Sequence, residues 1–265
     1  MNRYRRLTQI SSLILSNCYI LSGLKYCPFP IMNCHACPLA ATACGIGALQ
    51  NFLTIGAFPF LVLGIFILVG STIGRLLCGW ACPFGFFQEL LYKIPTNKLT
   101  LPQWTGMFKY LVFIVLVVLL PIIIHEPWFC KLCPVGALEA GVPLWLKDDG
   151  IRQMIGPLFH AKFLILYSML YLMMITERPF CRMVCPAGAM LSLFKKISLF
   201  RVSGVPDKCI PCSKCIKKCP AGVTPISNDC VMCMNCIGTC RNVRAGSKYS
   251  GQPNNVQDRI RINDR

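Results

Sequence analysis

The stretch LVFIVLVVLLPIII, residues 111–124, has no polar atom in any side chain and is the centre of an apolar run at residues 108–125. A helix needs about 20 predominantly apolar residues to cross the hydrocarbon core of a membrane. Hydrophobic residues make up 55% of the 265-residue chain and charged residues only 14%, whereas a soluble domain carries about a quarter charged residues. The stretch and the composition together predict an all-α polytopic membrane protein.

Three further runs are apolar enough for membrane spans, at residues 7–24, 51–74 and 158–176. The run at 51–74 has no charged residue, and the run at 158–176 has His160 and Lys162 only near its start. Long basic side chains can reach the interface from a helix end, so the sequence predicts four transmembrane helices. The run at 7–24 is too long for a cleavable signal peptide, and no small-residue cleavage site follows it.

Basic residues are divided unequally between the loops that four spans define. With a cytoplasmic N-terminus, five of the 27 Lys and Arg residues lie outside, which leaves 22 inside. The five are Lys25, Lys131, Lys147, Arg152 and Lys162. The positive-inside rule then predicts a multi-pass protein of the cytoplasmic (inner) membrane with both termini in the cytoplasm. This bias accounts for the net charge of +17, and no nucleic-acid-binding motif occurs, so we expect no nucleic-acid partner.

The run CIPCSKCIKKCPAGVTPISNDCVMCMNC, residues 209–236, contains most of two cysteine motifs, the second of which ends at Cys240. Both motifs have the spacing C-x2-C-x2-C-x3-C, which is that of bacterial ferredoxins, where the fourth cysteine of each motif binds the other cluster. The spacing therefore predicts two [4Fe-4S] clusters in a small α+β ferredoxin domain. The predicted ligands are Cys209, Cys212, Cys215 and Cys240 for one cluster, and Cys219, Cys230, Cys233 and Cys236 for the other.

Two other roles for these eight cysteines are less consistent with the pattern. C-x2-C pairs also build zinc sites, but two four-cysteine runs, with Pro220 after the first, favour iron–sulfur clusters. A disulfide framework is disfavoured because the segment is predicted to lie on the reducing cytoplasmic side.

The membrane half repeats the last part of a ferredoxin motif. After Cys219 the chain reads P-A-G, and the same kind of Pro-x-Gly sequence follows Cys82, Cys133 and Cys185, while Gly-Ile-Gly follows Cys44. Proline suits the first position of a helix, where its missing N–H is not needed, and glycine allows close approach of the backbone. The repeat therefore predicts cysteine-capped helices beside a bound group.

Because four helices alternate in direction, the membrane motifs are expected on both faces. Two pairs with the spacing C-x3-C-P follow the second and fourth spans, and these predict an inner cluster bound by Cys78, Cys82, Cys181 and Cys185. Two pairs with the spacing C-x2-C-P follow the first and third spans and predict an outer cluster. Its four ligands come from Cys34, Cys37, Cys44, Cys130 and Cys133, because Cys44 fits the repeat better than Cys37 does. The alternative is that these cysteines are structural or, outside, disulfide-bonded.

The sequences CGWACPFGFFQELLYKIP (78–95) and CRMVCPAGAM (181–190), followed by a double ferredoxin run, resemble the membrane polyferredoxins. That family includes the membrane subunit of the periplasmic nitrate reductase quinol-dehydrogenase module and the membrane core of the nitrous-oxide reductase regulator. The resemblance covers about residues 50–240 and implies electron transfer between quinone, or a cytoplasmic donor, and a redox partner. The chain departs from the pattern at Arg241, where a proline is usual after the last cysteine.

These features predict a membrane domain at residues 1–196, a ferredoxin domain at 197–244 and a polar tail at 245–265. We expect an electron-transfer subunit with four [4Fe-4S] clusters, and as partners lipid, other subunits of a membrane redox complex and quinone. A quinone-reactive dehydrogenase, a maturation factor that reduces a client metal site, and a tethered ferredoxin with structural membrane cysteines remain alternatives. No dinucleotide fingerprint, P-loop or nucleophile triad occurs, so we expect no catalytic residues.

The predicted electron path has a gap, because about 30 Å of hydrocarbon is too wide for one fast tunnelling step. Short re-entrant helices after Cys44 and Cys133 would bring the clusters into the membrane, since irregular backbone is tolerated where it is buried in protein. The alternative is a further cofactor, such as quinone, between the two clusters.

Overall fold

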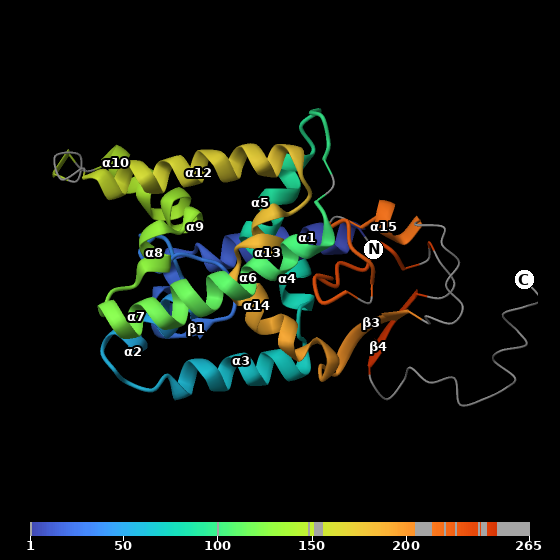
Figure 1. Cartoon of the computed structure of the whole chain (residues 1–265), viewed down its shortest axis with the longest axis horizontal. Helices are drawn as coiled ribbons and strands as arrows, with labels where there is room; N and C mark the ends of the chain where they lie inside the picture. Colours follow the sequence, from blue (N-terminus) through green and yellow to red (C-terminus); the bar gives the residue numbers. More distant parts are fainter. Residues whose placement is uncertain are drawn as a thin grey trace, which may run out of the picture.

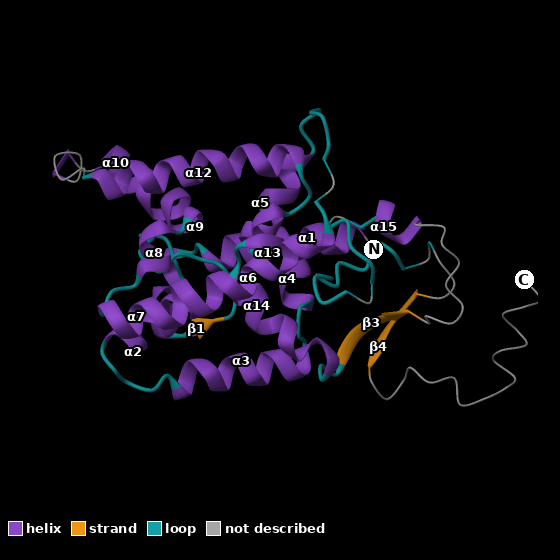
Figure 2. Cartoon of the chain, in the orientation of Figure 1, coloured by secondary structure: helices purple, strands orange, loops and turns teal. Residues whose placement is uncertain are grey.

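The structure is a computed structural model whose described residues are mostly helical and include two short two-stranded sheets (Figure 1; Figure 2). It describes residues 2–99, 101–147, 149–150, 156–204, 214–219, 221–225, 227–237, 239 and 243–247. Cys209, Cys212 and Cys240 therefore lie outside the described residues, as does the predicted polar tail beyond residue 247.

Two helices in the described part of the chain are long and apolar enough to cross a membrane. The first runs from Trp104 to Ile124, and the second is α12 (Pro157–Ile175). In their most apolar windows only 17% and 11% of the residues are buried, so their apolar side chains mostly face outward. A core helix of a soluble protein would be mostly buried, so these helices indicate a membrane protein, as the sequence predicted for these two runs.

The first of these helices is not uniform. It passes through η2 (Gln103–Met107), α6 (Phe108–Val112), the π-helical η3 (Phe113–Leu119) and α7 (Leu120–Ile124). In Figure 1, α6 and α7 lie between α12 at the top and α3 (Phe60–Thr72) at the bottom.

The other two predicted spans are each divided in the structure. Residues 7–24 fall in α1 (Asn2–Ser16) and the 3₁₀ helix η1 (Tyr19–Tyr26), and residues 51–74 fall in α2 (Gly45–Thr54) and α3. Gly56 has φ of +70° and Pro59 caps α3, so the backbone turns between α2 and α3 and cannot continue as one helix. α3 is apolar but has only 13 residues. The prediction of an unbroken span is therefore wrong for these two runs.

The remaining elements are short and connect the longer helices. They are β1 (Pro28–Phe29), β2 (Ala43–Cys44), α4 (Leu76–Trp80), α5 (Pro83–Tyr92), α8 (Trp128–Leu132), α9 (Pro134–Gly136), η4 (Ala137–Gly141), α10 (Val142–Lys147), α13 (Pro179–Met183), α14 (Pro186–Leu193), η5 (Phe194–Lys196), β3 (Phe200–Gly204), α15 (Lys214–Lys217) and β4 (Val243–Ser247). β1 pairs in parallel with β2, and β3 pairs antiparallel with β4.

The main core lies between the helices and contains both aromatic side chains and cysteines. Phe66, Phe84 and Phe180 are almost completely buried there, in the same cluster as Cys82 and Cys185. A second core lies in the part of the chain from β3 to β4, which we call the C-terminal segment, and includes Cys219, Cys230 and Cys236.

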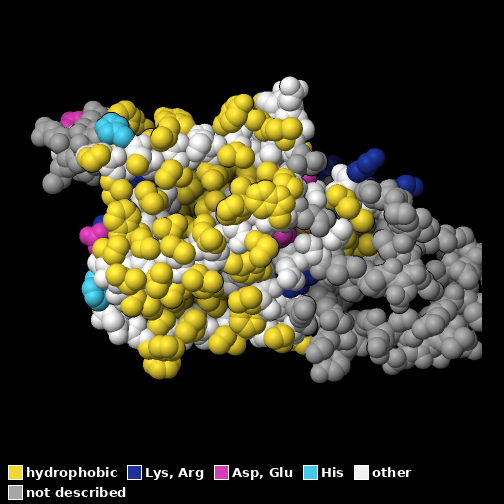
Figure 3. Space-filling model, in the orientation of Figure 1, with side chains coloured by type: hydrophobic (Ala, Val, Ile, Leu, Met, Phe, Trp, Pro, Cys, Tyr) yellow, Lys and Arg dark blue, Asp and Glu magenta, His cyan; other side chains and the backbone are white. Residues whose placement is uncertain are grey.

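Apolar side chains cover most of the helical part of the surface in Figure 3, whereas Lys and Arg side chains gather mainly beside the C-terminal segment. This distribution is the one expected for a membrane part and a basic part in contact with water.

Candidate functional site

Four cysteines occupy the same position, the cap at the start of a short helix. Cys44, Cys82, Cys133 and Cys185 precede α2, α5, α9 and α14. All four are extended, with φ from −73° to −64° and ψ from 111° to 121°. Three are followed by proline at the first helical position, as the sequence predicted. The N–H groups at a helix start have no partner within the helix and carry partial positive charge, so they offset part of the cost of a buried thiolate at this position.

The glycine three residues after each capping cysteine has a specific role. Its N–H donates to the cysteine sulfur, at 3.3 Å between Gly188 N and Cys185 Sγ, and equivalent bonds form in the other three repeats. A Cβ on Gly136 would lie 3.3 Å from Cys34 Sγ. Glycine therefore leaves room for a sulfur from a distant segment.

The four cysteines predicted to form the inner site line one cavity, which we call the proximal cavity. Cys78 lies in α4 and Cys181 in α13. At the end of each of these short helices, the N–H of the following capping cysteine donates to the carbonyl oxygen of the residue five positions earlier. The bonds are Cys82 N to Leu77 O at 3.0 Å and Cys185 N to Phe180 O at 2.9 Å. Two segments about 100 residues apart thus adopt the same local structure and supply two sulfurs each.

The cysteines of the proximal cavity lie in an environment that disfavours bare thiolates. Burial and the neighbouring Cys181 and Cys78 raise the pKa of Cys82 to about 12. Gln88, which is fully buried, donates to Cys181 Sγ at 3.0 Å. Because cysteine binds metal as the thiolate, the cavity needs positive charge to hold four sulfurs in their binding form.

A second cavity, which we call the distal cavity, is lined by Cys34, Cys44, Cys130 and Cys133 but not by Cys37. These are four of the five residues predicted for the outer site. The pairing of Pro28 with Ala43 and of Phe29 with Cys44 fixes the position of Cys44. Cys37 is buried elsewhere.

The two cavities have a wall in common. Met32 lines both, is only 3% exposed, and its N–H bonds to the sulfur of Cys82. Two residues further on, Cys34 lines the distal cavity. The two cavities are therefore neighbours, with Met32 in the wall between them.

The C-terminal segment brings together the second ferredoxin set. Cys219, Cys230, Cys233 and Cys236 are all buried, and Cys219 and Cys233 are hydrogen-bonded. That hydrogen bond lowers the pKa of Cys219 to about 6. Cys215, from the first predicted ferredoxin set, packs against the same core. The other three predicted ligands of that set lie outside the described residues.

The C-terminal segment contacts the helical part beside the proximal cavity. A Cβ on Gly79 would overlap the carbonyl oxygen of Val231 and lie 3.3 Å from the backbone of Cys233. Because Gly79 directly follows Cys78, this contact brings Cys233 of the C-terminal segment close to Cys78 of the proximal cavity.

Three cations near the cysteines were not identified as site residues from the sequence. Arg75, which is 1% exposed, lines the proximal cavity, bonds to the Cys78 thiol and donates from Nη1 to the Asn228 carbonyl. Arg178, also 1% exposed, donates to the Cys78 carbonyl at 3.2 Å. Lys162 lines the distal cavity. No sequence pattern indicates that these three residues lie beside the cysteines, because a basic residue near a predicted span is normally a surface charge.

The donor sets fit [4Fe-4S] clusters. Among the described residues, no three His, Cys, Asp or Glu side chains converge as the ligands of a single metal ion do. In a [4Fe-4S] cluster each of four thiolates binds a different iron, and each cavity is lined by four cysteines, which matches that number of ligands.

A helical protein with outward-facing apolar helices and buried four-cysteine cavities has the features of a membrane iron–sulfur protein. Residues 54–102, 107–148 and 163–203 match the family described as "4Fe-4S binding domain". The chain belongs to this family of membrane polyferredoxins, as its resemblance in sequence had indicated.

Relatives include an uncharacterized protein of Methanocaldococcus jannaschii, 30% identical over 67% of this chain and 72% of that protein. The "Putative electron transport protein YccM" of Escherichia coli is 27% identical over 68% of this chain and 52% of its own length. The "Ferredoxin-type protein NapH" of the same organism is 22% identical over 63% and 59%. The chain thus spans little more than half of the two named relatives. No solved structure matches it significantly. The family and these relatives support an iron–sulfur electron-transfer role.

Proposed function

We propose that this chain carries electrons between ferredoxin-type clusters in its C-terminal segment and two clusters in the helical part. The C-terminal ligands would be Cys209, Cys212, Cys215 and Cys240, and Cys219, Cys230, Cys233 and Cys236. The helical ligands would be Cys78, Cys82, Cys181 and Cys185 in the proximal cavity, and Cys34, Cys44, Cys130 and Cys133 in the distal cavity. The chain would lie in the cytoplasmic membrane with both termini inside and exchange electrons with quinone or a partner redox protein.

The continuous row of cysteine sites carries this proposal. Gly79 packs against the backbone of Cys233, Cys78 follows in the proximal cavity, and Met32 separates that cavity from the distal one. A bound [4Fe-4S] cluster takes up and releases one electron. If clusters occupy these sites, the separations between successive sites would be shorter than the thickness of about 30 Å of hydrocarbon that a single tunnelling step would otherwise have to cross.

The test is the iron content of the full-length protein purified without oxygen. We expect about sixteen iron atoms per chain, four from each cluster, and about twelve in Cys82→Ala/Cys185→Ala. The control is Cys18→Ala, because Cys18 lines neither cavity. About eight iron atoms in the unchanged protein, with no loss in the double variant, would instead make the chain a tethered ferredoxin with structural membrane cysteines.

The distal cavity gives a second prediction, which separates Cys44 from Cys37. Cys44→Ala is expected to remove up to about four iron atoms per chain, because Cys44 lines the cavity. Cys37→Ala should leave the iron content unchanged, although both residues are free cysteines in the structure. Iron loss from Cys37→Ala with full content in Cys44→Ala would reverse this ligand assignment.

A further inference from the structure

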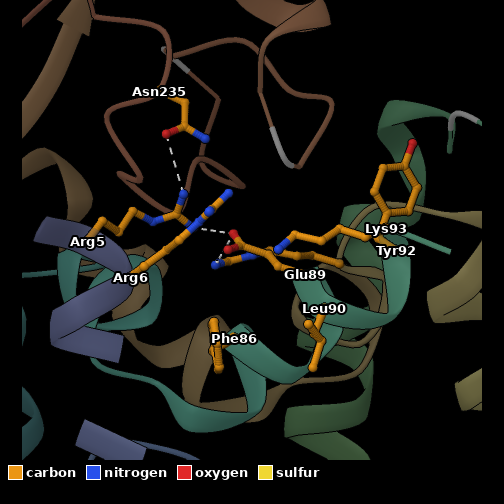
Figure 4. Close-up of a pocket in the computed structure, with 9 residues that line it drawn as sticks. Arg5, Arg6, Phe86, Glu89, Leu90, Tyr92, Lys93 and Asn235 are labelled. Atoms are coloured by element: carbon orange, nitrogen blue, oxygen red, sulfur yellow. Dashed lines mark hydrogen bonds and ion pairs between the residues drawn. The ribbon is translucent and has the colours of Figure 1, made fainter. Parts of the chain in front are cut away.

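A cavity of about 170 Å³ lies where α1, α5 and the C-terminal segment meet. Four basic residues line it (Arg5, Arg6, Lys93 and Arg178), together with one carboxylate, Glu89. Figure 4 shows Arg5, Arg6 and Lys93 extending toward the space around Glu89. The residues that line the cavity therefore carry a net charge of +3, which makes a strongly positive concave surface.

The charges of this cavity are only partly compensated within the protein. Arg5 and Arg178 both pair with Glu89, the latter at 2.6 Å. Arg6 and Lys93 are exposed, and among the described residues neither side chain has a hydrogen bond or an ion pair. The Nε of Arg178 is buried without a partner in the described structure. Several donors thus remain for an anion.

The cavity also has an apolar wall. Phe86 and Leu90 of α5 line it, and Leu90 is 50% exposed. Ile94, just beyond α5, is 38% exposed, so apolar surface continues away from the cavity. A phospholipid presents this combination, a phosphate joined to apolar chains, whereas free phosphate needs no apolar wall. Basic pockets beside membrane helices on the cytoplasmic side bind anionic headgroups in this way.

We propose that this cavity binds the phosphate of an anionic phospholipid through Arg6 and Lys93. Arg guanidinium groups and Lys ammonium groups are the usual partners of phosphate oxygens. Asn235, in the loop between Cys233 and Cys236, lines the same cavity and accepts a hydrogen bond from Arg5 at 3.4 Å. A headgroup bound in this cavity would therefore lie beside the C-terminal segment. The site requires a membrane but no cluster, so it is independent of the proposed electron transfer.

The experiment measures binding of phosphatidylglycerol and phosphatidylcholine to the full-length protein in detergent by native mass spectrometry. The variant Arg6→Gln/Lys93→Gln is expected to weaken phosphatidylglycerol binding about thirtyfold, since each basic residue near a membrane surface contributes about fivefold. The control Arg3→Gln/Lys147→Gln removes the same charge from exposed residues outside the cavity and should leave binding within about twofold.

Three results would overturn the proposal. If the control variant loses as much phosphatidylglycerol binding as Arg6→Gln/Lys93→Gln does, the effect depends on net charge and not on this cavity. If the unchanged protein binds phosphatidylcholine as well as phosphatidylglycerol, the site does not require an anionic lipid. Displacement of phosphatidylglycerol by millimolar inorganic phosphate would assign the site to a soluble phosphate instead. Iron content, measured on the same samples, should be unchanged in both double variants, so failure here is distinct from failure of the cluster assignment.

Discussion

Gly79→Ala is expected to slow electron transfer between the C-terminal segment and the proximal cavity while leaving the iron content unchanged. The added methyl group would overlap the carbonyl oxygen of Val231 and press on the backbone of Cys233. Backbone atoms cannot move aside as a flexible side chain can, and overpacking of this kind costs about 1–3 kcal/mol. The segment would relieve the overlap by moving away, and tunnelling weakens exponentially with the added distance.

Gly64→Ala is the matched control for this prediction. Gly64 lies in α3, and no atom lies within 4 Å of the position of an added Cβ, so alanine there should be neutral or stabilise the helix by up to about 1 kcal/mol. The measurements are rapid-mixing reduction of the proximal site by an external donor and the magnetic interaction between clusters in EPR spectra. An unchanged rate and unchanged interaction in Gly79→Ala would mean that electrons do not pass through this contact.

The repeated cysteine motif was predictable because its structure is local. Proline after Cys82, Cys133 and Cys185 favours a helix start, and the glycine that follows leaves space for sulfur. Both features depend on residues close in sequence, and the structure contains both. The spacing therefore indicated which cysteines cap helices without knowledge of the fold.

The sequence does not decide between Cys44 and Cys37 for the distal cavity, because the position of Cys44 depends on contacts that are not local. Cys34 and Cys37 have the regular spacing, but Cys44 is positioned by β2, which pairs with β1 about 15 residues earlier. Such a pairing of two-residue strands has no hydrophobic periodicity to reveal it. The Gly-Ile-Gly sequence after Cys44, which resembles the Pro-x-Gly repeat, is the signal that the sequence contains, and it is consistent with the structure.

Hydropathy alone overestimated the continuity of the apolar runs. A window over residues 51–74 averages across Gly56 and Pro59, where the chain turns. Similarly, counting charges by loop treats Arg75 and Lys109 as part of the basic cytoplasmic surface, yet both are buried, and Lys109 pairs with Asp229 of the C-terminal segment. Burial of a charge depends on tertiary contacts that a one-dimensional pattern does not contain.

Arg75→Met is expected to lower the reduction potential of the proximal site by about 59 mV or more, a tenfold change in its equilibrium for one electron. Arg75 lines the proximal cavity, bonds to the Cys78 thiol, and has a buried Nε without a partner in the described structure. Burial raises the pKa of Cys78, and Arg75 opposes that rise. The same positive charge favours the reduced, more negative state of the site, because charge interactions are strong in a buried environment.

Two further variants separate charge from packing in this prediction. Arg75→Lys keeps the charge and should retain most of the potential, whereas Arg182→Met removes a buried arginine of α13 that bonds to the Pro102 carbonyl at 2.8 Å and does not line the cavity. An EPR-monitored redox titration of all three variants, normalised to iron content, gives the potentials. If Arg182→Met and Arg75→Met shift the potential equally, the effect belongs to any buried arginine, and the specific role of Arg75 is lost. If Arg75→Lys behaves like Arg75→Met, the bond geometry of the guanidinium rather than its charge holds the potential, because lysine cannot bridge Cys78 and the Asn228 carbonyl as the guanidinium does.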